Sequence, residues 1–533
     1  MAFTSLFLLA GLLVFVVLVV VVIQRIMKKS DQRSDGSDLV SYLILAIAMG
    51  FTGFALARLA RTAFPGDQFI FDPAEQVATS LAALVVSTPF VVYFWRRQAD
   101  RRVAYPTSSG WTLYLALMEL VFMTAFVVVT TILLDGLFTG EGFGDWVSPI
   151  VFGAIVLFHE FAARRTPPRS DAADLYRVIG SAIGLISLTI GLTGTLSGVF
   201  SLPFDNLSGE FNPWLAMAVV GTPVWVYRWF SRTDPSPGLP RTVWTVLVAV
   251  GSLTAAVGSG TALVVLASQY VIGERSPGGQ HFESATWLLA MFVVTFAVWF
   301  AHRKELGPQR DNALRAYEYG AAAIGLAATL VGAIGLTILA FDEPALVGGG
   351  SNDVIATTGV LVGGLVSWLV LSRRHVAGDS ATEKTAWPRR LYNLGLGVIT
   401  ALVAAGSLVT ALFVLFRRVM GGDETASALV PVTVTVFTGL AAWYLLTAYA
   451  RERTTATDGQ IVVPFEVVVM CSHPGPLAAT FPEQARLRVI HRGDDLGVVD
   501  QEMASEIVAT VANQPSLVWV DGDGFRVAPK FTD

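Results

Sequence analysis

Few residues of this sequence could do chemistry inside an apolar environment, and Glu119 is the first of them. It stands in the run Leu-Met-Glu-Leu-Val-Phe, deeper within a long apolar segment than any other carboxylate. A charge at the centre of a membrane helix is costly, so each such residue is a functional hypothesis by default. Glu119 could bind a proton or a cation inside a helix bundle. The alternative is a protonated or hydrogen-bonded packing residue.

Other ionisable side chains lie nearer the ends of apolar segments. His159, Glu160 and Arg228 each precede basic residues by about one helical turn, which favours snorkelling toward the interface. Arg58 and Arg61 lie one turn apart at an opposite end, beside acidic loops. We expect these two arginines to be interfacial or salt-bridged anchors, with an anion-binding outer vestibule as the alternative.

Two prolines recur at matching places. Pro89 and Pro223 each follow a threonine in corresponding apolar segments. Proline removes a backbone hydrogen bond and bends a helix, and the freed carbonyl could line a cavity. Both are therefore helix-kink candidates, and kinked packing without any pathway is the alternative.

Composition limits what these residues can be doing. The chain has 533 residues, of which 53% are hydrophobic and 14% charged, with a mean hydropathy of +0.60. Soluble domains average about 25% charged residues, so an ordinary soluble enzyme is excluded. The single cysteine, Cys471, excludes an intramolecular disulfide framework and a Cys-rich zinc site. No P-loop, zinc-protease, Gly-x-Ser-x-Gly or c-type haem motif is present. The sequence therefore predicts no cofactor and no metal, and catalysis is not favoured.

Thirteen apolar segments are long enough to cross about 30 Å of hydrocarbon as helices. The first, 3–24, has basic residues after it rather than before it, which predicts an uncleaved anchor with the N-terminus outside. The other twelve are 39–60, 77–95, 111–134, 147–163, 176–201, 212–230, 243–271, 285–301, 317–341, 353–371, 392–416 and 428–449.

Basic residues assign the two sides of the membrane. Of the 36 Lys and Arg residues, 25 fall in alternate connections and only five in the opposite loops. By the positive-inside rule the first set is cytoplasmic. An odd number of spans then places the C-terminal domain in the cytoplasm. The sequence thus predicts a multi-pass protein of the plasma membrane.

An internal repeat organises the twelve later segments. Tyr42, Tyr176 and Tyr317 each open a segment, with Ala and Gly six and eight positions later. A second class of hairpin alternates with the first and opens at Tyr114, Trp244 and Tyr392. The interpretation is an anchor and basic linker (1–37) followed by three parallel four-helix units, here called the first, second and third units: 38–166, 173–306 and 313–453.

The repeated glycines have a simple structural explanation. Small residues on one helix face let neighbouring backbones approach closely. We therefore predict helix packing for Gly50, Gly184, Gly191, Gly194, Gly325, Gly332 and Gly335.

These motifs resemble those of a known family. An aromatic residue at the helix entry, a Gly-rich span, a short outer loop and an exit ending in aromatic-x-x-Arg are similar to an uncharacterised bacterial family of predicted four-helix membrane domains. That family is catalogued only as a domain of unknown function. The resemblance covers roughly 38–453 in about three tandem copies, and it implies the four-helix unit without supplying an activity.

The last segment, 459–533, follows a polar linker and is predicted to be a small soluble domain. It has ten acidic and five basic residues, which is a poor composition for nucleic-acid binding. The pattern predicts β-β-α-β-β, with a hairpin turn at Asp521–Gly524. Cys471, His473 and His491 could meet as metal ligands if the first two strands pair, although no C-x-x-C spacing supports this, and Asp-x-Asp-Gly lacks the Glu of a calcium loop.

Three functions remain open. The first is a non-enzymatic scaffold or sensor that couples an all-α, 13-helix membrane bundle to a partner-binding or self-associating α+β domain at 459–533. The second is a transporter or channel for a small solute or ion with a path between the units near Glu119. The third is a lipid-modifying membrane enzyme, which needs several polar groups at one depth, and the sequence looks too sparse in them.

Overall fold

The fold was obtained as a computed structural model. It describes residues 36–63, 73–104, 108–140, 144–166, 175–202, 211–230, 238–273, 281–307, 311–341, 350–377, 383–384, 386–420, 428–458, 466–471, 486–491, 499–511, 516–521 and 524–529. The predicted anchor at 3–24 lies outside these residues.

All twelve later apolar segments are helical. In the first unit the helices are α2 (Gly36–Ala63), α3 (Pro73–Arg97), the short α4 (Ala99–Ala104), α5 (Ser109–Met118), η1 (Glu119–Met123), α6 (Thr124–Thr139) and α7 (Val147–Arg165). In the second they are α8 (Leu175–Ser201), α9 (Phe211–Phe230), α10 (Leu239–Ile272) and α11 (Ala285–Glu305). In the third they are α12 (Asn312–Phe341), α13 (Ser351–Ala377), α15 (Trp387–Arg390), η5 (Leu391–Leu396), α16 (Gly397–Val419) and α17 (Leu429–Asp458).

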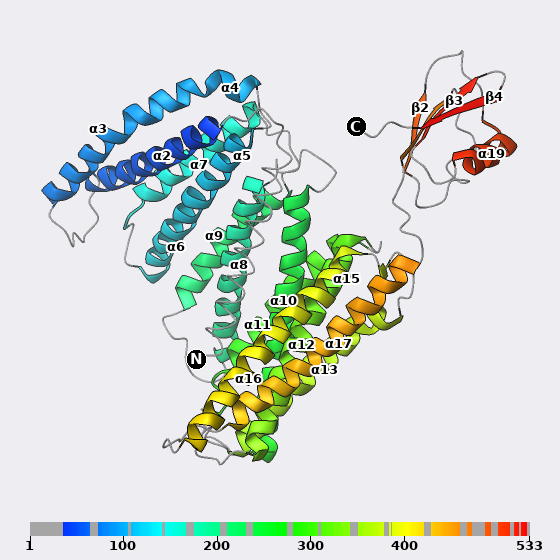
Figure 1. Ribbon diagram of the computed structural model, residues 1–533. Helices are drawn as coiled ribbons and strands as arrows, with labels where there is room; N and C mark the ends of the chain where they lie inside the picture. Colours follow the sequence, from blue (N-terminus) through cyan, green and yellow to red (C-terminus); the bar gives the residue numbers. More distant parts are fainter. Residues whose placement is uncertain are drawn as a thin grey trace.

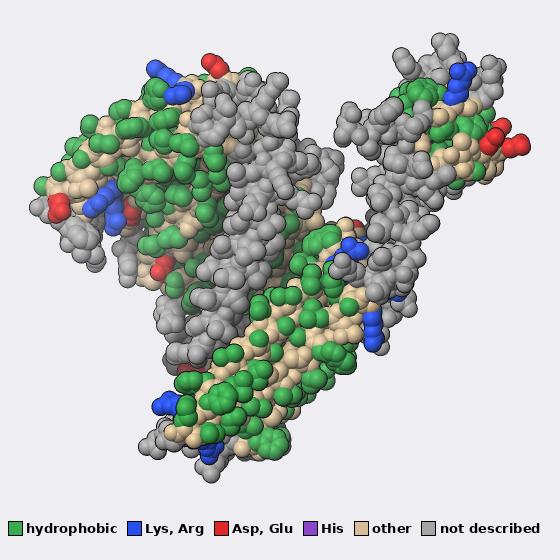
Figure 2. Space-filling view, viewed as in Figure 1, with side chains coloured by type: hydrophobic (Ala, Val, Ile, Leu, Met, Phe, Trp, Pro, Cys, Tyr) green, Lys and Arg blue, Asp and Glu red, His purple; other side chains and the backbone are tan. Residues whose placement is uncertain are grey.

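Eleven described helices are long and apolar enough to cross a membrane. These helices carry many large hydrophobic side chains on their outer faces, where Figure 2 shows an extended hydrophobic surface. Such a surface is typical of a membrane-embedded protein. Of the twelve predicted segments, only α9 falls short of the criterion for a membrane span.

The units pack in a row. In each unit the first two long helices pack along each other as a hairpin: α2 with α3, α8 with α9, and α12 with α13. In the described residues α5, η1 and α6 pack on α8 and α9, while α10 packs on α12 and α13. Consequently, the third helix of one unit lies against the first hairpin of the next (Figure 1). The division into three four-helix units stays a prediction, and these equivalent hairpins support it.

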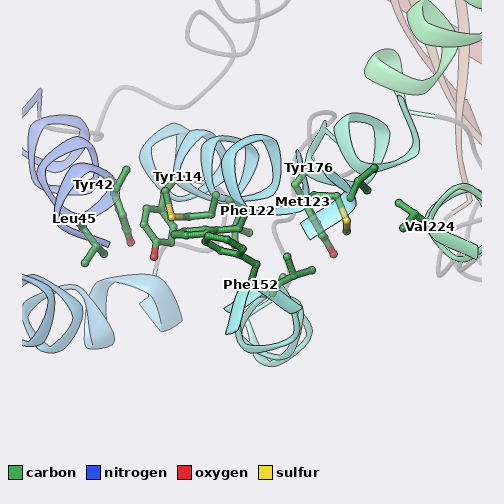
Figure 3. Packing of buried hydrophobic residues seen from close by; sticks show 14 of the residues in the cluster. Tyr42, Leu45, Tyr114, Phe122, Met123, Phe152, Tyr176 and Val224 are labelled. Atoms are coloured by element: carbon green, nitrogen blue, oxygen red, sulfur yellow. The ribbon is translucent and has the colours of Figure 1, made fainter. Parts of the chain in front are cut away.

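One hydrophobic core joins the first two units. It runs from Tyr42 and Leu45 on α2, through Phe122 on η1, to Tyr176 on α8 and Val224 on α9, as Figure 3 shows. Burial of aromatic side chains contributes much of the packing energy at such contacts. The first unit therefore shares its core with the second rather than standing alone.

The C-terminal domain has the predicted order of elements. β1 (Glu466–Cys471), β2 (Arg486–His491), α19 (Gln501–Val511), β3 (Ser516–Asp521) and β4 (Gly524–Pro529) form one four-stranded sheet, β2-β1-β3-β4, with one helix. β1 pairs in parallel with both β2 and β3, whereas β3 and β4 are antiparallel, with Asp521 opposite Gly524. The predicted hairpin is confirmed. Figure 1 shows the domain to one side of the helices.

The core of this domain explains its strand and helix patterns. Alternate residues Val467, Val469 and Cys471 of β1 are buried, and Ile507 and Val511 of α19 pack in the same cluster. Asp500 caps the helix by accepting a hydrogen bond from the Met503 backbone nitrogen at 2.8 Å. The buried face of the strand, which repeats every two residues, thus packs against the buried face of the helix, which repeats about every 3.6 residues.

Two of the three candidate metal ligands, Cys471 and His491, lie on neighbouring strands. The first two strands do pair, and Cys471 is the register partner of His491. His473 lies outside the described residues. Within the described part of the chain no three His, Cys, Asp or Glu residues gather in a metal-binding arrangement.

Candidate functional site: a buried ion cluster between two units

Glu119 is buried at the contact between the first and second units, with 4% of its surface exposed. It begins η1, a short π-helical insertion between α5 and α6. Such insertions are often found at functional sites because they shift the register of the helix face. A second insertion, η5, interrupts the corresponding helix of the third unit.

The partner of Glu119 is Arg228. Its Nη2 lies 2.8 Å from Glu119 Oε2, and its Nη1 donates to Glu160 Oε2. Arg228 comes from α9 of the second unit, whereas both carboxylates come from the first. A bridging guanidinium therefore joins the two units through charge-assisted hydrogen bonds.

The cluster extends toward the exposed surface through Arg164. Arg164 Nε donates to Glu160 Oε1 at 2.9 Å, and Arg164 Nη2 donates to the Tyr227 hydroxyl at 2.6 Å. Two carboxylates and two guanidinium groups thus make a charge-balanced set. We call Glu119, Glu160, Arg164, Tyr227 and Arg228 the ion cluster.

Snorkelling does not describe Arg228 and Glu160. Both are buried, at 3% and 6% exposure, and both point into the contact between helices. A buried charge that is paired and hydrogen-bonded does not need to reach water. Arg164 alone keeps most of its side chain exposed. The snorkelling expectation is therefore wrong for Arg228 and Glu160.

Gly180 on α8 makes room for the cluster. A Cβ at this position would overlap Glu119 Oε1 and lie 3.0 Å from Arg228 Cγ and 3.1 Å from Arg228 Nε. Glu119 Oε1 and Arg228 Nε make no hydrogen bond to a described residue. The ion cluster therefore occupies the space that a side chain at position 180 would take.

His159 also differs from the snorkelling expectation. It is 4% exposed, its Nδ1 lies 2.8 Å from the Ile155 carbonyl oxygen, and its Nε2 lies 2.7 Å from the Tyr114 hydroxyl. A carbonyl can only accept, so Nδ1 carries a proton, and a neutral ring then accepts from Tyr114 at Nε2. Each ring nitrogen of His159 therefore has a hydrogen-bond partner inside the helix bundle.

The two prolines do not line the bundle interior. Pro89 lies within α3 and Pro223 within α9, and both are exposed on the outer faces of their helices. Val85 and Val219, four residues earlier, carry the carbonyls that lose a partner, and they are exposed as well. The hypothesis that a freed carbonyl lines a cavity therefore has no support at either proline.

The repeated glycines lie at equivalent helix crossings. A Cβ at Gly184 would lie 2.5 Å from the Trp225 backbone nitrogen, and one at Gly325 would lie 2.7 Å from that of Trp368. At Gly191 and Gly332 a Cβ would likewise lie against backbone atoms of the facing helix. At Gly194 and Gly335 it would instead lie against the side chains of Trp214 and Thr357. Gly50 is the exception, because a Cβ there would meet no atom of the described residues within 4 Å. The packing explanation does not apply to Gly50.

One of the two outer arginines, Arg61, has an acidic partner. Arg61 Nε lies 3.7 Å from Asp145 Oδ2, across the ends of α2 and α7. This is a partly exposed ion pair between two helices of one unit. It fits the anchor expectation and does not require an anion-binding vestibule.

The third unit has ion pairs of its own. Arg389 Nη2 lies 2.6 Å from Glu452 Oε1, and Arg315 Nε lies 3.0 Å from Glu383 Oε2. Each pair joins two helical segments of the same unit. The ion cluster differs from them because it joins two units.

The sequence points to Glu119, whereas its pairing with Arg228 appears only in the fold. Arg228 falls within the predicted apolar segment 212–230, and opposite charges at membrane depth tend to pair. That pairing rule was the available signal. The expectation that polar groups are too sparse to converge is wrong, because the fold gathers Glu119, Glu160 and Arg228 from three helices.

Comparison with known proteins adds one finding. The model of a family described as a domain of unknown function (DUF5671) matches residues 38–158 and again residues 315–447. The two matches fall in the first and third units, so the chain contains tandem regions similar to that domain. No curated protein and no solved structure matches the chain.

Proposed function

We propose that the chain is a non-enzymatic, multi-pass membrane scaffold or sensor, in which the three units form a fixed row that carries the C-terminal domain. The observation behind this proposal is the ion cluster. Glu119, the carboxylate best placed to bind a transported ion, is instead paired with Arg228 of the next unit. Its negative charge is compensated within the protein.

The paired charges of the ion cluster favour a scaffold or sensor over a transporter. A cation carrier needs a carboxylate that exchanges its partner for the ion, whereas removing a guanidinium from two buried carboxylates is costly. The cluster instead fixes the relative position of two units through groups that lose their partners if the units separate. The apolar pocket between the second and third units is likewise poor in polar lining.

A transporter or channel remains the second candidate because of one observation. Glu119 Oε1 is buried and has no hydrogen-bond partner among the described residues. A carboxylate oxygen with an unused acceptor site is what an incoming proton or water would contact. A lipid-modifying enzyme is the third candidate. The polar groups that meet in the ion cluster favour it.

The proposed topology follows the positive-inside rule. Thirteen spans, an N-terminus outside and a cytoplasmic C-terminal domain in the plasma membrane agree with the distribution of basic residues. The acidic domain at 459–533 would then bind a cytoplasmic protein or a second copy of the chain, and not nucleic acid.

Flux measurements separate the candidates. We expect proteoliposomes containing the full chain to conduct protons and potassium no faster than protein-free vesicles. Glu119→Gln and the control Glu452→Gln, in the third unit, should leave that result unchanged. Flux through the wild-type chain that Glu119→Gln abolishes and Glu452→Gln preserves would replace the scaffold by a transporter.

Cross-linking in membranes tests the partner-binding part of the proposal. The full chain should form discrete cross-linked products with a partner or a second copy, and a chain ending at Asp458 should not. Identical products from both chains would remove the C-terminal domain from the proposed function.

A further inference from the structure

A long apolar pocket lies between the second and third units. Its volume is about 450 Å³, and its walls come from α10, α11, α12 and α13. This volume is within the range of ordinary small-molecule sites, about 300–1,000 Å³. It is remote from the ion cluster, which lies between the first and second units.

The shape of the pocket is that of a groove along the helices. Its lining runs from Leu253 to Gln269 on α10 and from Ala356 to Leu371 on α13. At a rise of about 1.5 Å per residue these stretches are about 24 Å and about 22 Å long. That length is most of the roughly 30 Å hydrocarbon thickness of a bilayer. A flexible hydrocarbon chain fits such a groove better than a compact solute does.

The walls offer little to a polar ligand. The hydroxyls of Thr254 and Ser367 donate to carbonyl oxygens of their own helices, at 2.8 Å and 2.7 Å. Most other lining residues are Ala, Val, Leu, Ile or Gly. A site lined mainly by such side chains favours an apolar ligand.

One end of the groove is polar. Gln269 and Ser284 line it there, and the Gln269 amide donates to the Asn352 carbonyl oxygen at 3.0 Å. By the positive-inside assignment this end faces the outer interface. The groove therefore offers an apolar channel below a polar rim, which matches the two parts of an amphiphile.

The groove is open beside Gly258. A Cβ at Gly258, which lines the groove, would meet no atom within 4 Å among the residues that the structure describes. At Gly363, on the facing helix, a Cβ would instead lie 2.5 Å from Thr261 Oγ1. The two helices therefore touch at Gly363 and separate at Gly258.

We propose that this groove is a lipid-binding site that holds one acyl chain of a membrane phospholipid, with the headgroup at the Gln269 end. In a bilayer, acyl chains are the apolar molecules that surround these helices, and an unfilled groove would forfeit the contacts a chain can make. The proposal is independent of whether the protein is a scaffold or a transporter.

The test fills the groove from Gly258. The control is Gly251 on the same helix, where a Cβ also meets no atom within 4 Å and which does not line the groove. Full-length wild type, Gly258→Phe and Gly251→Phe are purified in mild detergent and titrated with palmitoyl-oleoyl phosphatidylglycerol. Native mass spectrometry then counts the lipid molecules retained by each chain.

We expect one tightly held phospholipid in wild type and in Gly251→Phe, and at least tenfold weaker retention in Gly258→Phe. All three variants should have the same circular dichroism spectrum, and the smaller Gly258→Leu replaces Gly258→Phe if that variant is misfolded. Equal retention by all variants would overturn the proposal. So would a dimer that only Gly258→Phe disrupts, because a second copy of the chain would then occupy the groove.

Discussion

Replacing Arg228 by methionine is the most informative perturbation of this molecule. Arg228 is the only described guanidinium in contact with Glu119, and it also contacts Glu160. Removing it leaves two carboxylates buried in a protein interior, one of them with no counter-ion. Breaking a buried ion pair by deleting one partner costs about 3–5 kcal/mol, and we expect a loss of that size for Arg228→Met.

The other members of the cluster should rank below Arg228. Glu119→Gln leaves Arg228 paired with Glu160, so the loss should be near that of one hydrogen bond to a charged group, about 1.5–3 kcal/mol. The triple variant Glu119→Gln, Glu160→Gln, Arg228→Met carries no buried charge in the cluster. It should be more stable than Arg228→Met alone, because apolar or neutral replacement of a complete buried cluster is often close to neutral.

Unfolding of the purified full chain in detergent micelles, followed by circular dichroism, measures this ranking. Arg164→Met is the matched control, since it removes an exposed guanidinium that bonds to the same Glu160 and should change stability little. The reasoning fails if Arg228→Met loses no more stability than Arg164→Met. It also fails if the triple variant is as unstable as Arg228→Met.

Three further predictions follow from described contacts. Gly184→Ala should lose about 1–3 kcal/mol of stability in the same unfolding assay, because its Cβ would press on the backbone of α9, whereas Gly50→Ala should lose nothing. For topology, an impermeant maleimide added to intact cells should label Ser351→Cys and spare Lys304→Cys, each made in a chain without Cys471. The reverse pattern would invert the assigned orientation. Burial raises the pKa of the Cys471 thiol, so less thiolate is present at pH 8.5 and the native chain should react with maleimide much more slowly than the denatured chain. Equal rates before and after denaturation would contradict that burial.

The secondary structure could be predicted because its signals are local. Length and hydropathy predict the apolar helices. The β-branched residues of β1, the alternation in β2 and the Asp-Gly-Asp-Gly turn predict the C-terminal strands and hairpin. The glycine spacing on α8 and α12 likewise marks a helix face before any partner is known. Gly50 shows the limit, because a repeated position need not have a neighbour in every unit.

The candidate site could be predicted only in part. Glu119 is visible as a carboxylate in an apolar run, and its cost in a membrane makes it conspicuous. Its environment is not visible, since Arg228 lies 109 residues away in sequence and the two meet only when α9 packs on the first unit. The matching positions of the two prolines are evident from the sequence. The face of the helix on which each proline lies depends on how the helices pack.

Local signals in the chain were thus enough to predict the helices, the repeated hairpins and the order of the elements in the last domain, while its basic residues lead to the proposed sidedness. These depend on the chain's own periodicity, composition and charge. Tertiary structure alone decided that Glu119, Glu160 and Arg228 form one compensated cluster, that the prolines face outward, and that a groove opens beside Gly258. Each of these depends on which helix lies opposite, and that is set by side chains distant in the sequence that pack, pair or leave space together.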